Sequence, residues 1–369
     1  MPAPSAQLAQ RRLPRLLAWL LGGVAIGALL LGCALIVQLR NAVVGGGLAG
    51  LGVLAGGALS WWQLRYTIRH GQQQLEQVRR AQITERLTHA IDQLGNDKPE
   101  IAVAGIYALE RIALDAADEY RATVAEMLTA HIRTHAPWPL SRPGQYVATA
   151  PLDQVRSLRE RATTVQTALT VLDRNGFAET MELDLRSTDL RRADLEGARF
   201  PGVNLQCANL AGANLQGANL EGAYLPEVDL RHATLIGANL QHANLEGAHL
   251  QDAHLFWAHL QEACLGAADL QRADLDGANL QYAELWSANL QGANLRGADL
   301  QRADLHHADL QGAILADKRQ REDDLDAVFG GDADLREASL KGATADGRTR
   351  WPKGFDRRAA GVRLQRRGN

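Results

Sequence analysis

The sequence predicts a chain of three parts: an N-terminal hairpin of two transmembrane helices, a small α-helical region, and a long repeat architecture. Leu returns every fifth residue from Leu185 to Leu315 and is replaced only by Phe200. A five-residue period fits neither the 3.6 of an amphipathic helix nor the 2 of a strand, so it indicates a repeat. The hairpin with its N-terminal tail is expected at 1–65 and the helical region at 66–136. A linker with a capping helix follows at 137–180, then the repeat at 181–345 and a C-terminal cap with a basic tail at 346–369.

Two uncharged stretches, 16–39 and 42–64, predict the membrane hairpin. Each is long enough to cross a bilayer as a helix, which needs about 20 apolar residues. Arginines flank the pair on both outer sides, so the positive-inside rule places both termini in the cytoplasm. Glycines spaced four apart permit close helix contact and oligomerisation between hairpins. They are Gly23 and Gly27, Gly46 and Gly50, and Gly52 and Gly56.

A lipoprotein cleavage site at Cys33 is the competing interpretation of this segment. Leu30, Leu31 and Gly32 precede that cysteine after a basic start, as in such sites. The apolar run continues beyond Cys33 and exceeds the 7–15 residues of a signal-peptide core. These features favour the hairpin.

Helical spacing of apolar residues predicts the second part. One helix ends at Leu94, because Gly95 to Pro99 reads as a stop followed by a turn. A second carries Ile101 to Ile112, and Asp118 is expected to cap a third that runs through Ile132. The Pro-rich stretch 137–144 is the expected flexible joint before the repeat.

The repeat unit is Ala-(Asp/Asn)-Leu-X-X, as in Ala208-Asn209-Leu210 and Ala213-Asn214-Leu215. This pattern resembles the pentapeptide-repeat family. The resemblance implies a right-handed quadrilateral β-helix in which four pentapeptides form one square coil. The Leu and Ala side chains would then fill a narrow interior, and residues twenty apart would lie roughly 4.8 Å apart.

Segments outside the repeat resemble parts of the same family. Residues 82–86, 105–113 and 168–172 are similar to segments that precede the repeats in membrane-anchored bacterial members. The resemblance implies a multi-pass protein of the bacterial inner membrane, with the helices as an adaptor or as a cap on the first coil. Trp351-Pro352-Lys353-Gly354-Phe355 resembles the family's closing motif, in which aromatics cover the last coil. A charged insertion from Asp317 is expected to replace one coil.

Two groups of outward residues form the candidate partner surface. One is a column with a spacing of twenty residues, His242, Glu262, Tyr282 and Arg302, expected to stack as a polar ladder along one edge. The other comprises the large outward aromatics Phe256, Trp257, Tyr282 and Trp286. Trp and Tyr are enriched among the residues that anchor protein interfaces.

We expect no catalytic, cofactor or metal site. Regular spacing separates the carboxylates around the coil, and a filled coil leaves no substrate cavity. His249, His254 and His259 would point in three directions, whereas zinc needs ligands at about 2.1 Å from one point. Cys207 and Cys264 occupy unrelated repeat positions.

The expected function is a non-enzymatic, membrane-tethered scaffold that binds an unknown protein partner. The repeat opens a first alternative, because residues 181–315 hold 18 Asp and Glu against 8 Arg. Some family members are acidic rods that resemble DNA and occupy the DNA-binding saddle of gyrase. A second alternative is an effector that perturbs the lipid bilayer through the Gly-rich hairpin. Nucleic acid is not an expected partner.

Overall fold

The computed structural model describes residues 32–38, 40, 49–138, 152–316 and 332–365. They fall in two compact units, 1–82 and 83–369, which we describe separately. The helices are α2 (Ala49–Leu94), α3 (Pro99–Asp115), α4 (Ala117–His135), η1 (Leu152–Gln154), α5 (Leu158–Arg161), α6 (Thr163–Arg174) and η2 (Phe177–Glu179). The strands are β1 (Thr344–Ala345) and β2 (Arg363–Leu364), and residues 32–38 and 40 are also helical.

The described residues contradict the predicted transmembrane hairpin, on which the predicted multi-pass membrane location rested. Among helices in the described part of the chain, none is both long and apolar enough to cross a membrane. The second predicted span does not end at residue 64, because α2 continues through Arg65 and Arg69 to Leu94. The prediction rested on absence of charge, yet Gly, Ser60 and Gln63 dilute the apolar character of this stretch. Most of the first span lies outside the described residues.

The glycine spacing likewise gives no evidence of tight helix contact. Gly23, Gly27 and Gly46 lie outside the described residues, and Gly50 and Gly52 fall in the first turn of α2. A Cβ added at Gly56 would meet no atom within 4 Å, so no described segment packs closely on it.

The helical region confirms the predicted stop and corrects the predicted cap. Helix α2 ends at Leu94 and α3 begins at Pro99. Asp118 is not an N-cap, because α4 already begins at Ala117. The single residue Ala116 ends α3 by donating its N–H to the Ile112 carbonyl at 3.0 Å and also precedes α4. No loop remains in which Asp118 would stand ahead of the helix.

Helices α3, α4 and α6 pack on one another around a fully buried apolar cluster that includes Ile106, Leu128 and Leu169. The same cluster holds the buried carboxylate of Glu110, which binds Arg174 and Asn175. Burial alone would raise the pKa of Glu110. The hydrogen bonds from Arg174 and Asn175 outweigh burial and lower that pKa overall, so the group stays charged.

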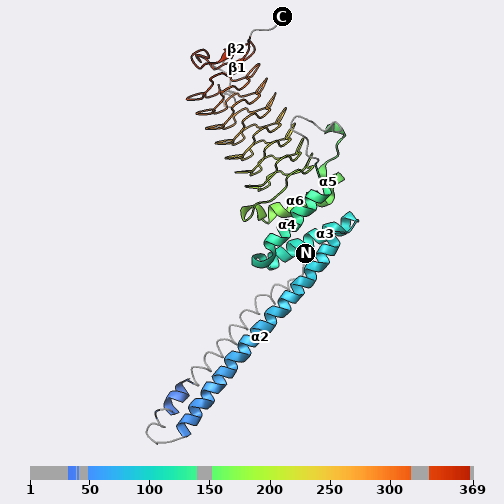
Figure 1. Cartoon of the computed structure of the whole chain (residues 1–369), viewed down its shortest axis with the longest axis vertical. Helices are drawn as coiled ribbons and strands as arrows, with labels where there is room; N and C mark the ends of the chain where they lie inside the picture. Colours follow the sequence, from blue (N-terminus) through green and yellow to red (C-terminus); the bar gives the residue numbers. More distant parts are fainter. Residues whose placement is uncertain (1–31, 39, 41–48, 139–151, 317–331, 366–369) are drawn as a thin grey trace, which may run out of the picture. The chain divides into compact units, whose positions relative to one another are not determined.

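The repeat forms a stack of twenty-residue coils. Parallel bridges join residues twenty apart, as in Asn209 with Asp229 and Asp229 with His249. Each coil uses its Leu N–H in the same way: that of Leu210 donates to the Asp229 carbonyl at 2.7 Å. Figure 1 shows these rungs stacked between α6 and the β1–β2 pair. The twenty-residue coil that the family resemblance implies is therefore confirmed.

The interior is filled by the side chains that the repeat predicts. Leu230, Leu250 and Leu270 are at most 1% exposed, and the smaller side chains two residues before them, Val228, Ala248 and Ala268, are equally buried. Two of every five residues form the turn between sides, so each side pairs through a single bridge. Among the described residues only β1 and β2 therefore form an extended strand pair, in parallel.

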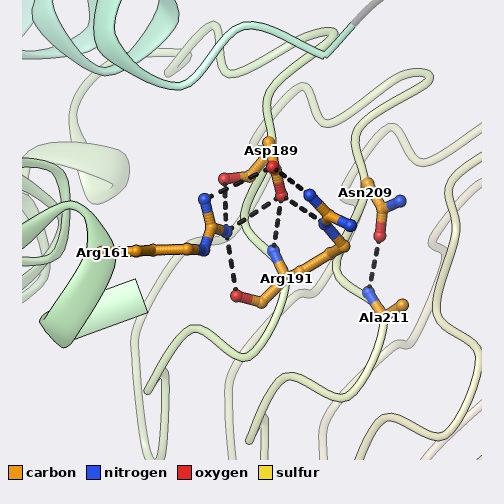
Figure 2. A network of polar contacts seen from close by, with 5 residues as sticks. All are labelled: Arg161, Asp189, Arg191, Asn209 and Ala211. Carbon is orange, nitrogen blue, oxygen red and sulfur yellow. Dashed lines mark hydrogen bonds and ion pairs between the residues drawn. The ribbon is translucent and has the colours of Figure 1, made fainter. Parts of the chain in front are cut away.

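The helices cap the first coil by hydrogen bonds to its open backbone edge. The Arg161 guanidinium binds the Asp189 carboxylate at 2.9 Å and also the carbonyls of Asp189 and Arg191 (Figure 2). The Gln166 side chain of α6 donates to the Asp194 carbonyl and accepts the Asp194 N–H. Burial would raise the pKa of Asp189, but bonding to Arg191 and the charge of Arg161 lower it overall. The edge is thus covered, as unpaired strand edges require.

Aromatic rings pack at the other end of the stack, as predicted. Trp351 and Phe355 stack with centroids 5.2 Å apart and rest on the buried core. The predicted charged insertion falls on 317–331, outside the described residues. On either side of it Asp299 bridges Asp334, so the stack resumes in register. Most of the predicted flexible joint at 137–144 also lies outside the described residues.

Replacing Leu245 by Asp should unfold the coils around it. The side chain is 0% exposed, and a carboxylate there would be buried without a partner. We expect a loss of at least about 4 kcal/mol in the free energy of unfolding. Urea denaturation followed by circular dichroism measures it. The control is the exposed neighbour Glu246→Gln; equal midpoints for both variants would contradict the inward position of Leu245.

Acid should weaken the helical cap through His131. Burial, and then the neighbouring His135, lower the pKa of His131 to about 4. Because the unfolded state binds this proton more readily, the stabilisation is fully present above about pH 6.5 and is lost as the pH falls towards 4. The loss amounts to about 3 kcal/mol. His131→Phe should flatten the stability profile between these pH values, whereas the exposed control His89→Gln should keep the wild-type slope.

Candidate functional site

The corners of the coil present the side chains that are available to a partner. At each corner the second turn residue adopts a left-handed backbone, with φ of 57° at His242, 58° at Glu262 and 59° at Tyr282. Glycine occupies this position in many other repeats because a side chain there is strained by about 1–2 kcal/mol. A side chain that stands there points away from the filled core. Its contacts come from the coils before and after it.

The predicted polar ladder forms, and we call it the Tyr282 edge: His242, Glu262, Tyr282, Arg302 and Glu337. His242 Nδ1 lies 3.4 Å from Glu262 Oε2. Arg302 donates to the Tyr282 hydroxyl at 2.6 Å and to Glu337 Oε2 at 2.7 Å, with its guanidinium 5.4 Å from the Tyr282 ring centre. The bonds to Glu337 and then to Tyr282 raise the pKa of Arg302. Tyr282 remains 49% exposed.

Sequence reasoning missed Glu337, the last member of this edge. It lies 35 residues after Arg302 instead of twenty. The excess of fifteen is a multiple of five and corresponds to segment 317–331, so Leu335 returns in phase and Arg336-Glu337 occupies the turn. If segment 317–331 is left out of the count, Glu337 lies twenty residues after Arg302, so a count that omits the insertion would have found this residue.

The aromatic part of the candidate surface does not form one patch. Residues twenty apart share a corner, so Trp257 stands with Gly277, Trp286 with Gly266, and Tyr282 with Arg302. Trp257 is 47% exposed, lies over Gly277 and has Phe256 beside it with ring centroids 4.3 Å apart. Three corners therefore carry the aromatics, and only Tyr282 belongs to the ladder.

The outward Asp and Asn of the repeat have a structural role. Their Oδ1 accepts the N–H of the residue two places on, which fixes the turn at each corner. Figure 2 shows Asp189 and Asn209 doing this for Arg191 at 3.2 Å and Ala211 at 2.9 Å. Either side chain suits the position because both offer this oxygen. Many acidic groups of the repeat are therefore explained without a partner.

Carboxylates at this and at other outward positions of the repeat are also paired with arginine. Ion pairs join Asp229 to Arg231, Asp252 to Arg272 and Asp276 to Arg296, at 2.6–2.9 Å. His249, His254 and His259 bridge to Asp269, Asp274 and Asn279 in three separate columns. Among the described residues, no group of three His, Cys, Asp or Glu is arranged to hold a metal ion.

Comparison with known sequences identifies the repeat. The sequence model of the pentapeptide repeats matches in four overlapping segments, 182–217, 213–252, 253–285 and 278–317. These segments are the stacked coils themselves. The chain belongs to the pentapeptide-repeat family. No curated protein sequence matches it.

Solved pentapeptide-repeat structures resemble part of the chain. HetL from the cyanobacterium Nostoc sp. strain PCC 7120, involved in heterocyst differentiation regulation, is 32% identical over 44% of this chain and 77% of its own, with a TM-score of 0.26. The Nostoc pentapeptide-repeat protein alr5209 is 36% identical over 29% and 84%, with a TM-score of 0.15. Full-length QnrB1, a plasmid-mediated fluoroquinolone resistance protein, is 16% identical over 49% and 91%, with a TM-score of 0.24. Scores this low carry no argument about function.

Gly277→Ala should displace the Trp257 indole from its corner. A Cβ at Gly277 would lie 2.4 Å from Trp257 Cδ1, too close for the ring to keep its place. Fluorine NMR of 5-fluorotryptophan-labelled protein should show a shift of the Trp257 resonance. Gly237→Ala is the matched control, because its φ of 63° gives the same strain but its Cβ would meet nothing within 4 Å. An unchanged Trp257 signal in Gly277→Ala would contradict this contact.

Proposed function

We propose that this pentapeptide-repeat protein is a non-enzymatic scaffold that binds a protein partner along the Tyr282 edge. The observation that carries the proposal is the five-residue ladder itself. It crosses five successive coils at one corner. The four intervals between these coils give the ladder a length of about 19 Å, at a strand spacing of about 4.8 Å. A partner would meet a straight row of charged and aromatic groups on a rigid support.

The chemistry of the edge suits protein recognition. Tyr and Arg are over-represented among residues that dominate interface energies, and here the Tyr282 ring and the Arg302 guanidinium lie together. Bonds to Tyr282 and Glu337 hold Arg302 in place, so less side-chain freedom is lost on binding. The strained backbone at these corners is a further reason to look for a function there.

The filled interior supports a non-enzymatic role. Leu and Ala side chains occupy the space inside the coil, where a substrate would otherwise be enclosed. The outward carboxylates support the turns or pair with arginines on their own or adjacent coils. Neither arrangement directs an acid and a base at one point, as general acid–base catalysis requires.

A second candidate is an acidic mimic of duplex DNA that acts on gyrase. The excess of acidic residues over 181–315 favours it. The arginine pairs within the repeat weaken it. Acidic residues of consecutive repeats also do not form one row, since Asp299, Asp304 and Asp309 lie in three different columns. A supercoiling assay distinguishes the two, since only a mimic should inhibit gyrase in proportion to its concentration.

Removing the centre of the Tyr282 edge should abolish partner binding without unfolding the coil. The double variant Tyr282→Ala, Arg302→Ala deletes the aromatic group and the cation together. We expect a partner recovered in stoichiometric amount with the tagged full-length protein to fall at least tenfold, measured by quantitative mass spectrometry. Circular dichroism should remain unchanged, because both side chains are outside the core.

Asp252→Ala, Arg272→Ala is the matched control. It removes an ion pair between adjacent coils at a different corner, with similar exposure. Equal partner recovery by the wild type and both double variants would exclude the Tyr282 edge as the binding surface. Equal loss in both would indicate damage to the coil instead of the loss of a surface.

A further inference from the structure

A basic groove opens near the C-terminal end of the stack, at a corner other than that of the Tyr282 edge. Its volume is about 530 Å³. The polar side chains that line it are Asp304, His306, His307, Ser339, Lys341 and Arg363. This composition contrasts with the repeat below, where acidic residues exceed basic ones by ten over 181–315.

Backbone hydrogen bonds hold the three segments of the groove side by side. The His307 N–H donates to the Lys341 carbonyl at 3.2 Å, and the Gly342 N–H donates to the Gly361 carbonyl at 3.1 Å. The backbone of Arg363 is held by its own N–H, which donates to the Ala343 carbonyl at 2.8 Å. Cationic and imidazole groups from successive layers therefore face one hollow, at intervals of about 4.8 Å.

Two glycines keep the hollow open. Gly342 has a φ of 79°, and a Cβ there would lie 2.8 Å from His307 Nδ1. Gly361 has a φ of 78°, and a Cβ there would lie 3.4 Å from the Lys341 Cα. A side chain at Gly342 would therefore displace the His307 ring, and one at Gly361 would come into contact with Lys341.

The positive charge of the groove is not cancelled from within. Its carboxylate, Asp304, already binds His306 Nδ1 at 2.7 Å and accepts the His306 N–H. Among the described residues, no carboxylate forms an ion pair with Lys341 or Arg363. An ammonium and a guanidinium thus share the hollow with the Ser339 hydroxyl and the His307 imidazole, each able to donate a hydrogen bond.

We propose that this groove binds a phosphate monoester. Arginine offers a planar fork that matches two phosphate oxygens, and lysine adds a point charge for the third. The Ser339 hydroxyl and the His307 imidazole supply neutral donors around them. A compact dianion suits the groove better than an extended nucleic acid, because the acidic repeat beside it repels a long polyanion. The site is independent of the Tyr282 edge.

Isothermal titration calorimetry of the full chain tests the proposal with three probes: inorganic phosphate, O-phosphoserine and a serine-containing peptide in its phosphorylated and unphosphorylated forms. We expect binding of the phosphorylated probes and none of the unphosphorylated peptide. Tighter binding of the phosphopeptide than of inorganic phosphate would assign the ligand to a protein side chain. Equal affinities would assign it to a small phosphate compound.

Lys341→Gln and Arg363→Gln should each weaken phosphate binding by roughly tenfold, the factor expected for losing a charged hydrogen bond. Both side chains are exposed, so the stack should stay folded. Arg358→Gln is the matched control, since it removes the same charge from the same end of the chain outside the groove. Absence of phosphate binding, equal affinities in all three variants, or tighter binding of a short DNA duplex than of phosphate would overturn the proposal.

Discussion

The structure depends on one constraint: a large and a small apolar side chain must alternate inside a coil that is only as wide as they are. Leu and Ala satisfy it at nearly zero exposure along the stack. Their burial fixes the phase of every turn, and that phase brings residues twenty apart into hydrogen-bonded register. Each coil contacts mainly the coils beside it, so stability is added layer by layer.

The same constraint decides where function is located. Because the interior is filled, the repeats of this chain differ mainly on the exterior, and the turn positions at the corners hold many different residue types. Glycine meets the left-handed geometry of a corner at no steric cost, so any larger residue there requires another reason. Along the Tyr282 edge the reason is contact between successive coils, which holds a tyrosine and an arginine in fixed positions. At Trp257 the indole covers the glycine of the next coil.

The ends of the stack required elements that the repeat does not supply. At the N-terminal end, α6 and Arg161 occupy the open edge, and the partly buried Arg161–Asp189 contact ties the helices to the coil (Figure 2). At the C-terminal end, the rings of Trp351 and Phe355 pack on the core. The basic groove is formed where the regular repeat gives way to this closing segment.

The sequence was sufficient for the coil, because its five-residue repeat resembles that of a family with a known coil and its apolar positions mark the side chains that face inward. It was also sufficient for the first four members of the ladder, since a spacing of twenty translates directly into a column. It failed where other features decide the structure. Absence of charge in 42–64 suggested a membrane span, although α2 carries too much polar and small-residue sequence. Glu337 was missed because an insertion hides the register, and the groove because its residues come from three separate segments.

Site-specific photocrosslinking in the cells that express this protein tests the central claim most directly. A photoreactive phenylalanine analogue at Glu262 stands on the Tyr282 edge, and the same group at Asp252 stands on a different corner of the same stack. The account predicts a discrete protein adduct from position 262 and none from position 252. Identical adducts from both positions, or none from position 262, would contradict a partner surface along this edge.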